Sequence, residues 1–346
     1  MKLFLLFPLI LAAYSLSLAQ PKYAAESRKV FKQAVKEYEN NNQSEAEKLF
    51  RQCVELEPNY AEAYFNLSKI SYKNEQFPEA LVNAQKAYSK NKLQPTIYSQ
   101  LGRCHFQLES YDSAAYYLHK AIRLGDKSEN TYLFAAKSFN EIKDYAEAIQ
   151  NVNKAIEIND KSPLNFNTRG QIFFNRGDYE NAVIDFEKAL EINPNSTGIY
   201  VNLANTKLLL GEEDEAIKLI NTGLSTASKE EKVQLYLLQG NYYHKKGDYK
   251  KATENYEKAK GLDQNNAAVL NNQAAVFLDQ GKFQSALELC NEALDLNPEM
   301  TAAYFNRGIA NEMLKNVDAA CSDWEQAFIL GSEKAEEYLN SPTCNE

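Results

Sequence analysis

Small and large apolar residues recur along this chain with a nearly fixed spacing. Alanines mark that spacing, at Ala46, Ala80, Ala114, Ala148, Ala182, Ala216, Ala252, Ala286 and Ala320. Twelve residues before each alanine the side chain is always small, and sixteen residues before it the side chain is large and mostly aromatic. Small residues let two helices approach closely, and a large side chain fills the space beside them. A repeat of this length predicts stacked two-helix units, so we expect an all-α solenoid.

The fifth unit shows which family the repeat resembles. It reads PLNFNTRGQIFFNRGDYENAVIDFEKALEINPNS, with an aromatic residue at Phe166, a small residue at Gly170, Gly-Asp-Tyr in the turn and Pro194 near the end. This unit resembles the tetratricopeptide repeat. The resemblance implies a right-handed superhelical solenoid of helix-turn-helix units that binds proteins or peptides on its concave face.

Nine such units cover residues 27–334. Their expected bounds are 27–60, 61–94, 95–128, 129–162, 163–196, 197–232, 233–266, 267–300 and 301–334. We expect one elongated domain with no linker. Unit six departs most from the pattern, because Lys207 replaces an aromatic residue, Gly223 replaces a small alanine and two residues are inserted. Ser228 and Glu231 then predict a capping box that starts the next helix about half a turn early, which makes this junction a candidate hinge.

The first nineteen residues have a different character. Lys2 precedes an apolar run over residues 3–13, and Ser17 and Ala19 are small residues before Gln20. This order is typical of a cleavable signal peptide at 1–19, followed by a lead-in at 20–26. The alternative is an uncleaved anchor, although the apolar run is short for a membrane span. No cysteine follows the run and no retention signal ends the chain, so we expect an exported protein, periplasmic or secreted.

The chain ends in a predicted capping helix and tail at residues 335–346. Ala335 keeps the repeat register and Pro342 then ends the helix, as an open-ended solenoid requires a polar cap. Cys321 lies in the last repeat and Cys344 lies just beyond the cap. They either form a disulfide that joins the cap to the last repeat or remain two thiols, since connectivity does not follow from sequence.

Composition and motifs exclude several classes of function. The chain has 38 Lys and Arg against 47 Asp and Glu, a net charge of −9, which disfavours binding to nucleic acid or to an anionic membrane surface. Its three histidines are scattered, and no zinc-protease, hydrolase or phosphate-loop motif is present. We therefore expect no catalytic residue, no metal site and no cofactor, and predict that the protein is not an enzyme.

The first helices of the units supply candidate ligand contacts. In tetratricopeptide proteins these helices build the concave face, so the resemblance implies which positions line it. In the N-terminal units those positions hold cations and rings, at Lys69, Arg103, Lys137, Tyr38, Tyr72 and Phe106. In the C-terminal units they hold amides, at Asn202, Asn205, Asn241, Asn272 and Asn306. Cations suit carboxylates and rings suit apolar anchors, so we expect an acidic or C-terminal peptide segment as ligand.

Two alternatives remain at this stage. The charged side chains can be merely solvated while the rings pack between neighbouring repeats. The function can also differ: we expect a non-catalytic interaction scaffold in the cell envelope, and the alternative is a periplasmic chaperone or holdase that grips unfolded exported chains. A scaffold copurifies with one or two folded partners, whereas a holdase binds many denatured proteins. The sequence leaves the oligomeric state open.

Overall fold

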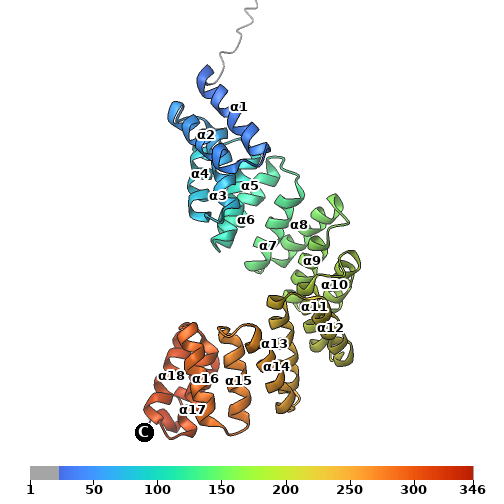
Figure 1. Cartoon of the computed structure of the whole chain (residues 1–346), viewed down its shortest axis with the longest axis vertical. Helices are drawn as coiled ribbons and strands as arrows, with labels where there is room; N and C mark the ends of the chain where they lie inside the picture. The colour runs from blue at the N-terminus through green and yellow to red at the C-terminus, as the bar shows by residue number, and fades with distance from the viewer. Residues whose placement is uncertain (1–22, 346) are drawn as a thin grey trace, which may run out of the picture. The chain divides into compact units, whose positions relative to one another are not determined.

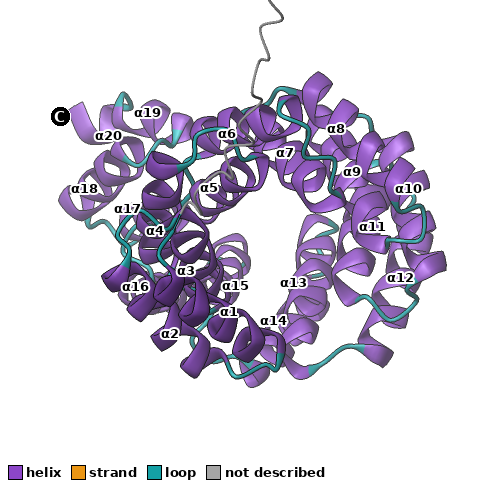
Figure 2. Cartoon of the chain, turned by 90° about the horizontal axis from the view of Figure 1, so that it is seen from above, coloured by secondary structure: helices purple, strands orange, loops and turns teal. Residues whose placement is uncertain are grey.

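The protein is all-helical throughout the part that its structure, a computed structural model, describes, residues 23–345. Figure 2 shows helices joined by short loops, with no strand in these residues. The predicted signal peptide at 1–19 and the start of the lead-in lie outside the described residues. Within 23–345 the expected all-α fold is therefore confirmed.

The helices fall into two compact units, Met1–Ile142 and Lys143–Glu346. The boundary between them falls inside the fourth predicted repeat. Repeats of a solenoid contact only their neighbours, so contacts divide such a chain readily, and the single elongated domain stays a prediction.

Unit 1 contains seven helices within its described residues (Figure 1). They are α1 (Ala25–Glu39), α2 (Gln43–Leu56), α3 (Ala61–Lys73), α4 (Phe77–Lys90), α5 (Pro95–Gln107), α6 (Tyr111–Arg123) and α7 (Glu129–Glu141). Each helix packs against the next, and the odd-numbered first helices α3, α5 and α7 also pack against one another in sequence order. The first helices thus form a continuous layer.

Unit 2 repeats this arrangement over the described residues 143–345. Its helices are α8 (Tyr145–Ile158), α9 (Pro163–Arg176), α10 (Tyr179–Ile192), α11 (Thr197–Leu209), α12 (Glu213–Thr226), α13 (Lys229–Lys245), α14 (Tyr249–Leu262), α15 (Ala267–Asp279), α16 (Phe283–Leu296), α17 (Thr301–Met313), α18 (Val317–Ile329), α19 (Glu333–Leu339) and α20 (Pro342–Asn345). The last two are short helices that contact α18 and each other.

In several repeats the small residue of the first helix faces a large residue of the second helix. Where that small residue is glycine, a Cβ atom would collide with the facing side chain: 2.3 Å from Trp324 at Gly308 and 2.4 Å from Tyr256 at Gly240. Trp324 and Tyr256 are themselves fully buried. The size complementarity that the spacing predicts therefore determines how closely the two helices of a repeat approach.

The turn between the two helices has the same backbone in every repeat. A left-handed residue follows the first helix, directly at Gly177 and as the second residue in the other repeats, with φ of 73–86° where it is glycine and 57–67° in five repeats where it is not. The next N–H bonds back five residues, as from Asp178 to the Phe173 carbonyl at 2.9 Å. This is the hydrogen bond of a helix C-cap with a left-handed residue. Asp178 then accepts from the N–H of Asn181 and starts the second helix.

The junction between repeats six and seven departs from the others. Ser228 and Glu231 form the predicted capping box, and α13 begins at Lys229. This start is four residues before the expected bound of 233, just over one turn, where we expected half a turn. Within unit 2, α12 and α13 pack less extensively than any other second helix and following first helix. The buried Lys207 is neutralised locally by Glu212 and Glu215.

Candidate functional site

Lys69 of α3 lies over an aromatic ring of the preceding first helix. Its Nζ is 4.8 Å from the centre of the Tyr38 ring on α1 and 5.9 Å from that of Phe65. A cation held over a ring is attracted by the negative face of the π system. The predicted residues Tyr38 and Lys69 therefore meet across the junction between the first and second repeats.

Arg103 of α5 continues this arrangement one repeat further. Its Cζ lies 4.5 Å from the centre of the Tyr72 ring on α3 and 5.3 Å from that of Phe134 on α7. Phe134 also lies 5.9 Å from Nζ of Lys137 and makes an edge contact with Phe106. All six predicted residues of unit 1 thus join one series, which we call the cation–ring row: Tyr38, Lys69, Tyr72, Arg103, Phe106, Phe134 and Lys137.

Sequence reasoning missed Phe134. It occupies a position where the family resemblance favours an amide, as at Asn66 in the second repeat. An aromatic ligand contact was therefore not predicted there. The available signal was the aromatic character itself, next to cations at Arg103 and Lys137. The structure shows that this ring contacts both.

The cations of the row have no carboxylate partner among residues 23–345. Lys69, Arg103 and Lys137 are half-buried, and none of them forms an ion pair there. The Nε of Arg103 is buried without a hydrogen-bond partner in the same residues. Burial also lowers the pKa of Lys137 from its ordinary value. A carboxylate placed beside the row would therefore pair with cations that have no carboxylate partner in the described residues.

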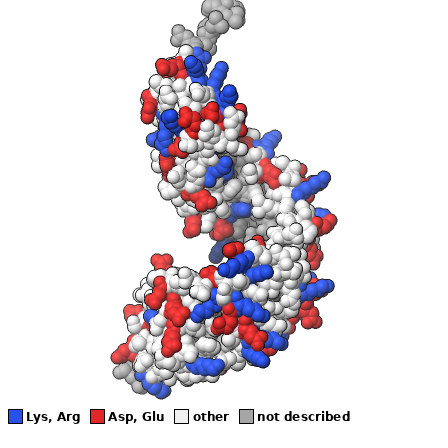
Figure 3. Space-filling view, in the orientation of Figure 1, with Lys and Arg blue, Asp and Glu red and all other residues white. Residues whose placement is uncertain are grey.

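A cavity of about 430 Å³ opens beside the row. Its lining residues include three cations and one carboxylate: Tyr38, Lys69, Tyr72, Lys73, Glu75, Phe77, Gln100, Arg103 and Gln107. The side-chain amide of Gln107 donates to the Tyr72 hydroxyl at 2.9 Å, so that hydroxyl keeps its own proton to donate. By contrast, the face of the molecule in Figure 3 carries basic and acidic side chains interspersed.

Four of the five predicted amides of unit 2 bond to other asparagine side chains. Asn306 donates to Asn271, Asn271 to Asn272, and Asn272 to Asn241, over distances of 2.9, 3.4 and 2.9 Å. Asn241 also accepts from the Tyr256 hydroxyl. In a separate contact Asn202 donates to Asn167 at 3.1 Å, while Asn205 is half-buried. These side chains form a ladder across repeats, and their role in peptide binding stays a prediction.

Two arginines of unit 2 have partners that the sequence did not reveal. Arg169 binds Asp185 through two hydrogen bonds of 2.7 Å, and Arg307 binds Asp323 at 2.6–3.0 Å. Each also donates to an asparagine of the preceding repeat, Asn153 or Asn291. The carboxylates are nearly fully buried, with side-chain exposures of 3% and 7%. These arginines are structural.

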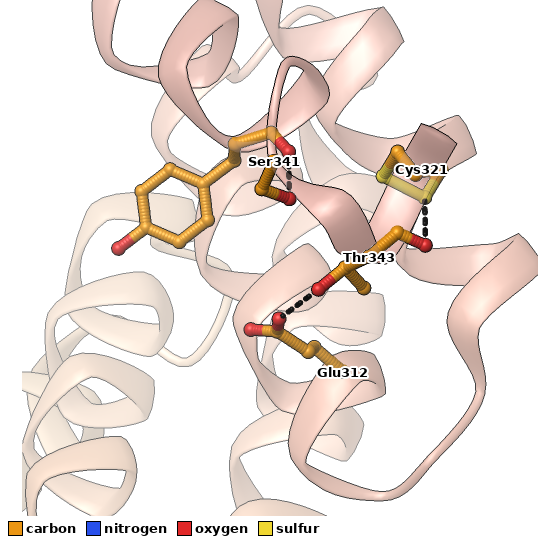
Figure 4. Close-up of a disulfide and its surroundings, with 6 residues drawn as sticks. Glu312, Cys321, Ser341 and Thr343 are labelled. Carbon is orange, nitrogen blue, oxygen red and sulfur yellow. Dashed lines mark hydrogen bonds between the residues drawn. A yellow bond between two sulfur atoms is a disulfide. The ribbon is translucent and has the colours of Figure 1, made fainter. Parts of the chain in front are cut away.

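A disulfide joins the C-terminal cap to the last repeat (Figure 4). Cys321 of α18 and Cys344 of α20 are bonded, with their Cα atoms 5.7 Å apart. The Thr343 hydroxyl donates to Glu312 at 3.0 Å. Tyr338 of α19 packs against Trp324. The remaining three cysteines are buried free thiols, and burial raises the pKa of Cys104 to about 11.

Nothing in residues 23–345 assembles a metal site, since no group of three or more His, Cys, Asp or Glu side chains is placed to hold an ion. His105 stacks on Tyr117, and burial lowers its pKa. Over the same residues, every helix is too short or too polar to cross a bilayer.

Comparison with known proteins defines the family. Several stretches match the tetratricopeptide repeat family: residues 49–82, 166–196, 186–218, 233–266 and 271–335. A tetratricopeptide repeat protein from Parabacteroides merdae has a similar solved structure, with a TM-score of 0.58 at 16% identity, covering 73% of this chain and all of that one.

Two curated relatives match over a shorter stretch. RNA polymerase II-associated protein 3 of Xenopus laevis is 37% identical over 28% of this chain, and Hsp70-Hsp90 organizing protein 3 of Arabidopsis thaliana is 32% identical over 30%. The chain spans only 15% and 20% of the lengths of these relatives. Together with the fold, these matches show that the chain belongs to the tetratricopeptide repeat family, whose stacked repeats are protein-interaction scaffolds.

Proposed function

We propose that this protein is an exported, non-catalytic scaffold that holds an acidic peptide segment of a partner protein along the cation–ring row. One observation carries the proposal: three cations of consecutive repeats lie against rings and have no carboxylate partner in residues 23–345, and two of them, Lys69 and Arg103, line a cavity. In a chain with more acidic than basic residues, such an arrangement favours an external anion.

The rings add a reason to choose a peptide as the anion. Tyr72, Phe106 and Phe134 offer apolar area between the charged groups, and amphipathic rings are frequent anchors of protein interfaces. A simple inorganic anion would pair with the cations but would make no apolar contact with these rings. A peptide with acidic and apolar side chains would use both.

Export rests on the two ends of the chain. The first nineteen residues have the charge, apolar run and small residues of a signal peptide. The bond between Cys321 and Cys344 supports the same location, because disulfides persist in oxidising compartments. The site of action is therefore the periplasm or the medium.

The relatives support a scaffold over an enzyme. The name of the Arabidopsis protein describes an organiser of Hsp70 and Hsp90. The name of the Xenopus protein describes an association with RNA polymerase II. Both names describe attachment to other proteins. By analogy, this chain brings partner proteins together in the envelope.

Crosslinking and copurification from the native envelope test the proposal. The variant Lys69→Glu, Arg103→Glu and Lys137→Glu reverses the three charges of the row. The matched control Lys48→Glu, Lys86→Glu and Arg123→Glu makes the same charge change on the second helices α2, α4 and α6. We expect the first variant to lose its partner and the control to keep it. If both retain every partner, the row is not the binding site.

A holdase would behave differently in the same experiment. It would recover many denatured proteins with little sequence preference, and the charge-reversed variant would recover nearly as many. The amide ladder of unit 2 is the feature that could serve such binding, since amides can bond any peptide backbone.

A further inference from the structure

We propose that the cation–ring row selects a peptide in the polyproline II conformation that carries an acidic side chain at every third residue. This inference rests on the proposed function, because it specifies the ligand of the same site. It starts from the spacing of the cations. Lys69, Arg103 and Lys137 occupy the same position on α3, α5 and α7, so the row presents one cation per repeat.

The distance between successive cations follows from helix packing. The helices α3, α5 and α7 pack directly against their neighbours in the first-helix layer. Packed helices have axes about 8–10 Å apart. Because the cations hold equivalent positions on these helices, they recur along the groove at about this interval.

Only some peptide conformations place side chains on one face at that interval. A polyproline II helix has about three residues per turn and rises ~3.1 Å per residue, so every third side chain recurs on one face after ~9.3 Å. A flat β-strand puts same-face residues at about 6.6 or 13.2 Å, because its side chains alternate. The interval of the row therefore matches polyproline II and not a strand.

The lining of the row favours the same conformation. Aromatic-lined grooves bind polyproline II segments. The proline rings of such a segment pack on aromatic side chains, and its backbone is free to form hydrogen bonds with polar groups. Between the cations the row offers Tyr72 and Phe106 to the intervening residues. A polyproline II backbone has no internal hydrogen bonds, so its carbonyls remain to accept from the Tyr72 hydroxyl.

Synthetic nine-residue peptides test the spacing by fluorescence anisotropy with the full mature chain. The first has three repeats of Glu-Pro-Ala, and three others place Glu at every second residue, at every fourth residue, or in scrambled order at equal charge. A longer helix-forming peptide places Glu seven residues apart, an interval of ~10.5 Å on a helix. We expect the Glu-Pro-Ala peptide to bind at least about tenfold more tightly than each of the others, as a matched set of charge-assisted bonds predicts.

Variants link the preference to the row. Arg103→Gln is expected to weaken binding of the Glu-Pro-Ala peptide about tenfold. Arg103→Lys keeps the positive charge but replaces the planar guanidinium, so it separates the contribution of the charge to binding from that of the planar group. Lys86→Gln is the matched control, because Lys86 also lies over a ring, 5.5 Å from the centre of Tyr64, but on a second helix. Thermal unfolding monitored by circular dichroism checks that each variant is folded.

The outcomes separate the two proposals. Equal binding of all acidic peptides, with loss in Arg103→Gln, overturns the spacing and leaves the acidic groove intact. Tightest binding of the helical peptide also overturns the spacing. Binding that Arg103→Gln leaves unchanged overturns the groove itself. An oligothymidine of equal charge that competes as well as the peptide shows a general polyanion site and overturns the inference.

Discussion

The arginines of the two units use the same side chain in opposite ways. The guanidinium of Arg307 in unit 2 donates to Asp323 and Asn291, and that of Arg169 donates equivalently to Asp185 and Asn153. Arg103 in unit 1 lies between two rings, and its Nε has no partner within residues 23–345. The first two are held by carboxylates that the sequence supplies, and the third is held by aromatic faces.

This difference distinguishes charged side chains that stabilise the fold from charged side chains that can bind a ligand. A buried ion pair satisfies both partners, and removing one of them leaves an uncompensated charge. A cation over rings is oriented without being neutralised, since the ring faces carry no formal charge. The charge of Arg103 therefore has no carboxylate partner within residues 23–345, whereas that of Arg307 is paired with Asp323.

The largest expected effect is on the stability of unit 2. Asp323→Ala removes the carboxylate that binds Arg307 and accepts from Asn311, and should lower the free energy of unfolding by about 3 kcal/mol. Denaturant unfolding measures the change. Lys188→Ala is the control, because its pair with Glu191 is exposed and is expected to contribute below ~0.5 kcal/mol. A cost of Asp323→Ala no greater than that of the control would contradict the structural role.

The glycines beside the two arginines provide a second comparison. In Gly308→Ala the new Cβ would lie 2.3 Å from Nε1 of the buried Trp324, and we expect a loss of about 2–3 kcal/mol. In Gly102→Ala it would lie 2.5 Å from Leu118, a more adaptable side chain, and we expect about 1–2 kcal/mol. Gly198→Ala is the control, since its Cβ meets nothing within 4 Å. Calorimetric unfolding that ranks Gly102→Ala above Gly308→Ala would refute this account.

The disulfide predicts a local effect at the end of unit 2. The bond closes a separation of 23 residues, and a loop of this size corresponds to about 3 kcal/mol in the chain-entropy model. Cys321→Ser with Cys344→Ser should therefore speed hydrogen exchange in α19 and α20. Exchange in the helices of unit 1 should not change. Protection of the cap that survives the double substitution would show that packing of Tyr338 on Trp324 is sufficient.

Most of the fold could be predicted from the sequence because it depends on the spacing of small and large residues within each repeat. The small residue at Gly308 and the large one at Trp324 recur at fixed positions, so the two-helix unit followed directly. The left-handed turn residue could be anticipated at Gly177 but not at Glu75, where φ is 60° and the surrounding turn imposes the conformation. The division after Ile142 has no sequence signal, as both sides keep the repeat pattern.

The candidate site could be predicted only in part. The repeat register identified Arg103 and Tyr72 as residues of one face, yet their stacking depends on the angle at which α3 and α5 pack. Phe134 was missed for the same reason, since its contact with Arg103 crosses from one repeat to the next. The pairing of Arg307 with Asp323 required knowledge of which faces of two helices meet. The repeat register predicts which face of a helix a residue occupies, but its contact partner depends on how the helices pack in three dimensions.

The smallest expected effect concerns the pH dependence of peptide binding. Burial lowers the pKa of Lys137, so its charge is lost at a lower pH than that of an ordinary lysine. The unfolded chain then holds this proton more firmly than the folded one, and the stability contribution of Lys137 rises with pH between the two pKa values. Affinity for an acidic peptide changes in the opposite sense, and should fall about twofold at the pH where half of the Lys137 side chains are neutral.

Lys137→Arg tests this titration directly, because arginine keeps its charge throughout the range. Anisotropy titrations with the Glu-Pro-Ala peptide between neutral and alkaline pH should show the early decline in the native protein, and Lys137→Arg should lack this early decline. Lys69→Arg serves as the matched control and should retain the decline. If Lys137→Arg declines like the native protein, Lys137 does not contact the acidic ligand, and the row of ligand-binding cations ends at Arg103.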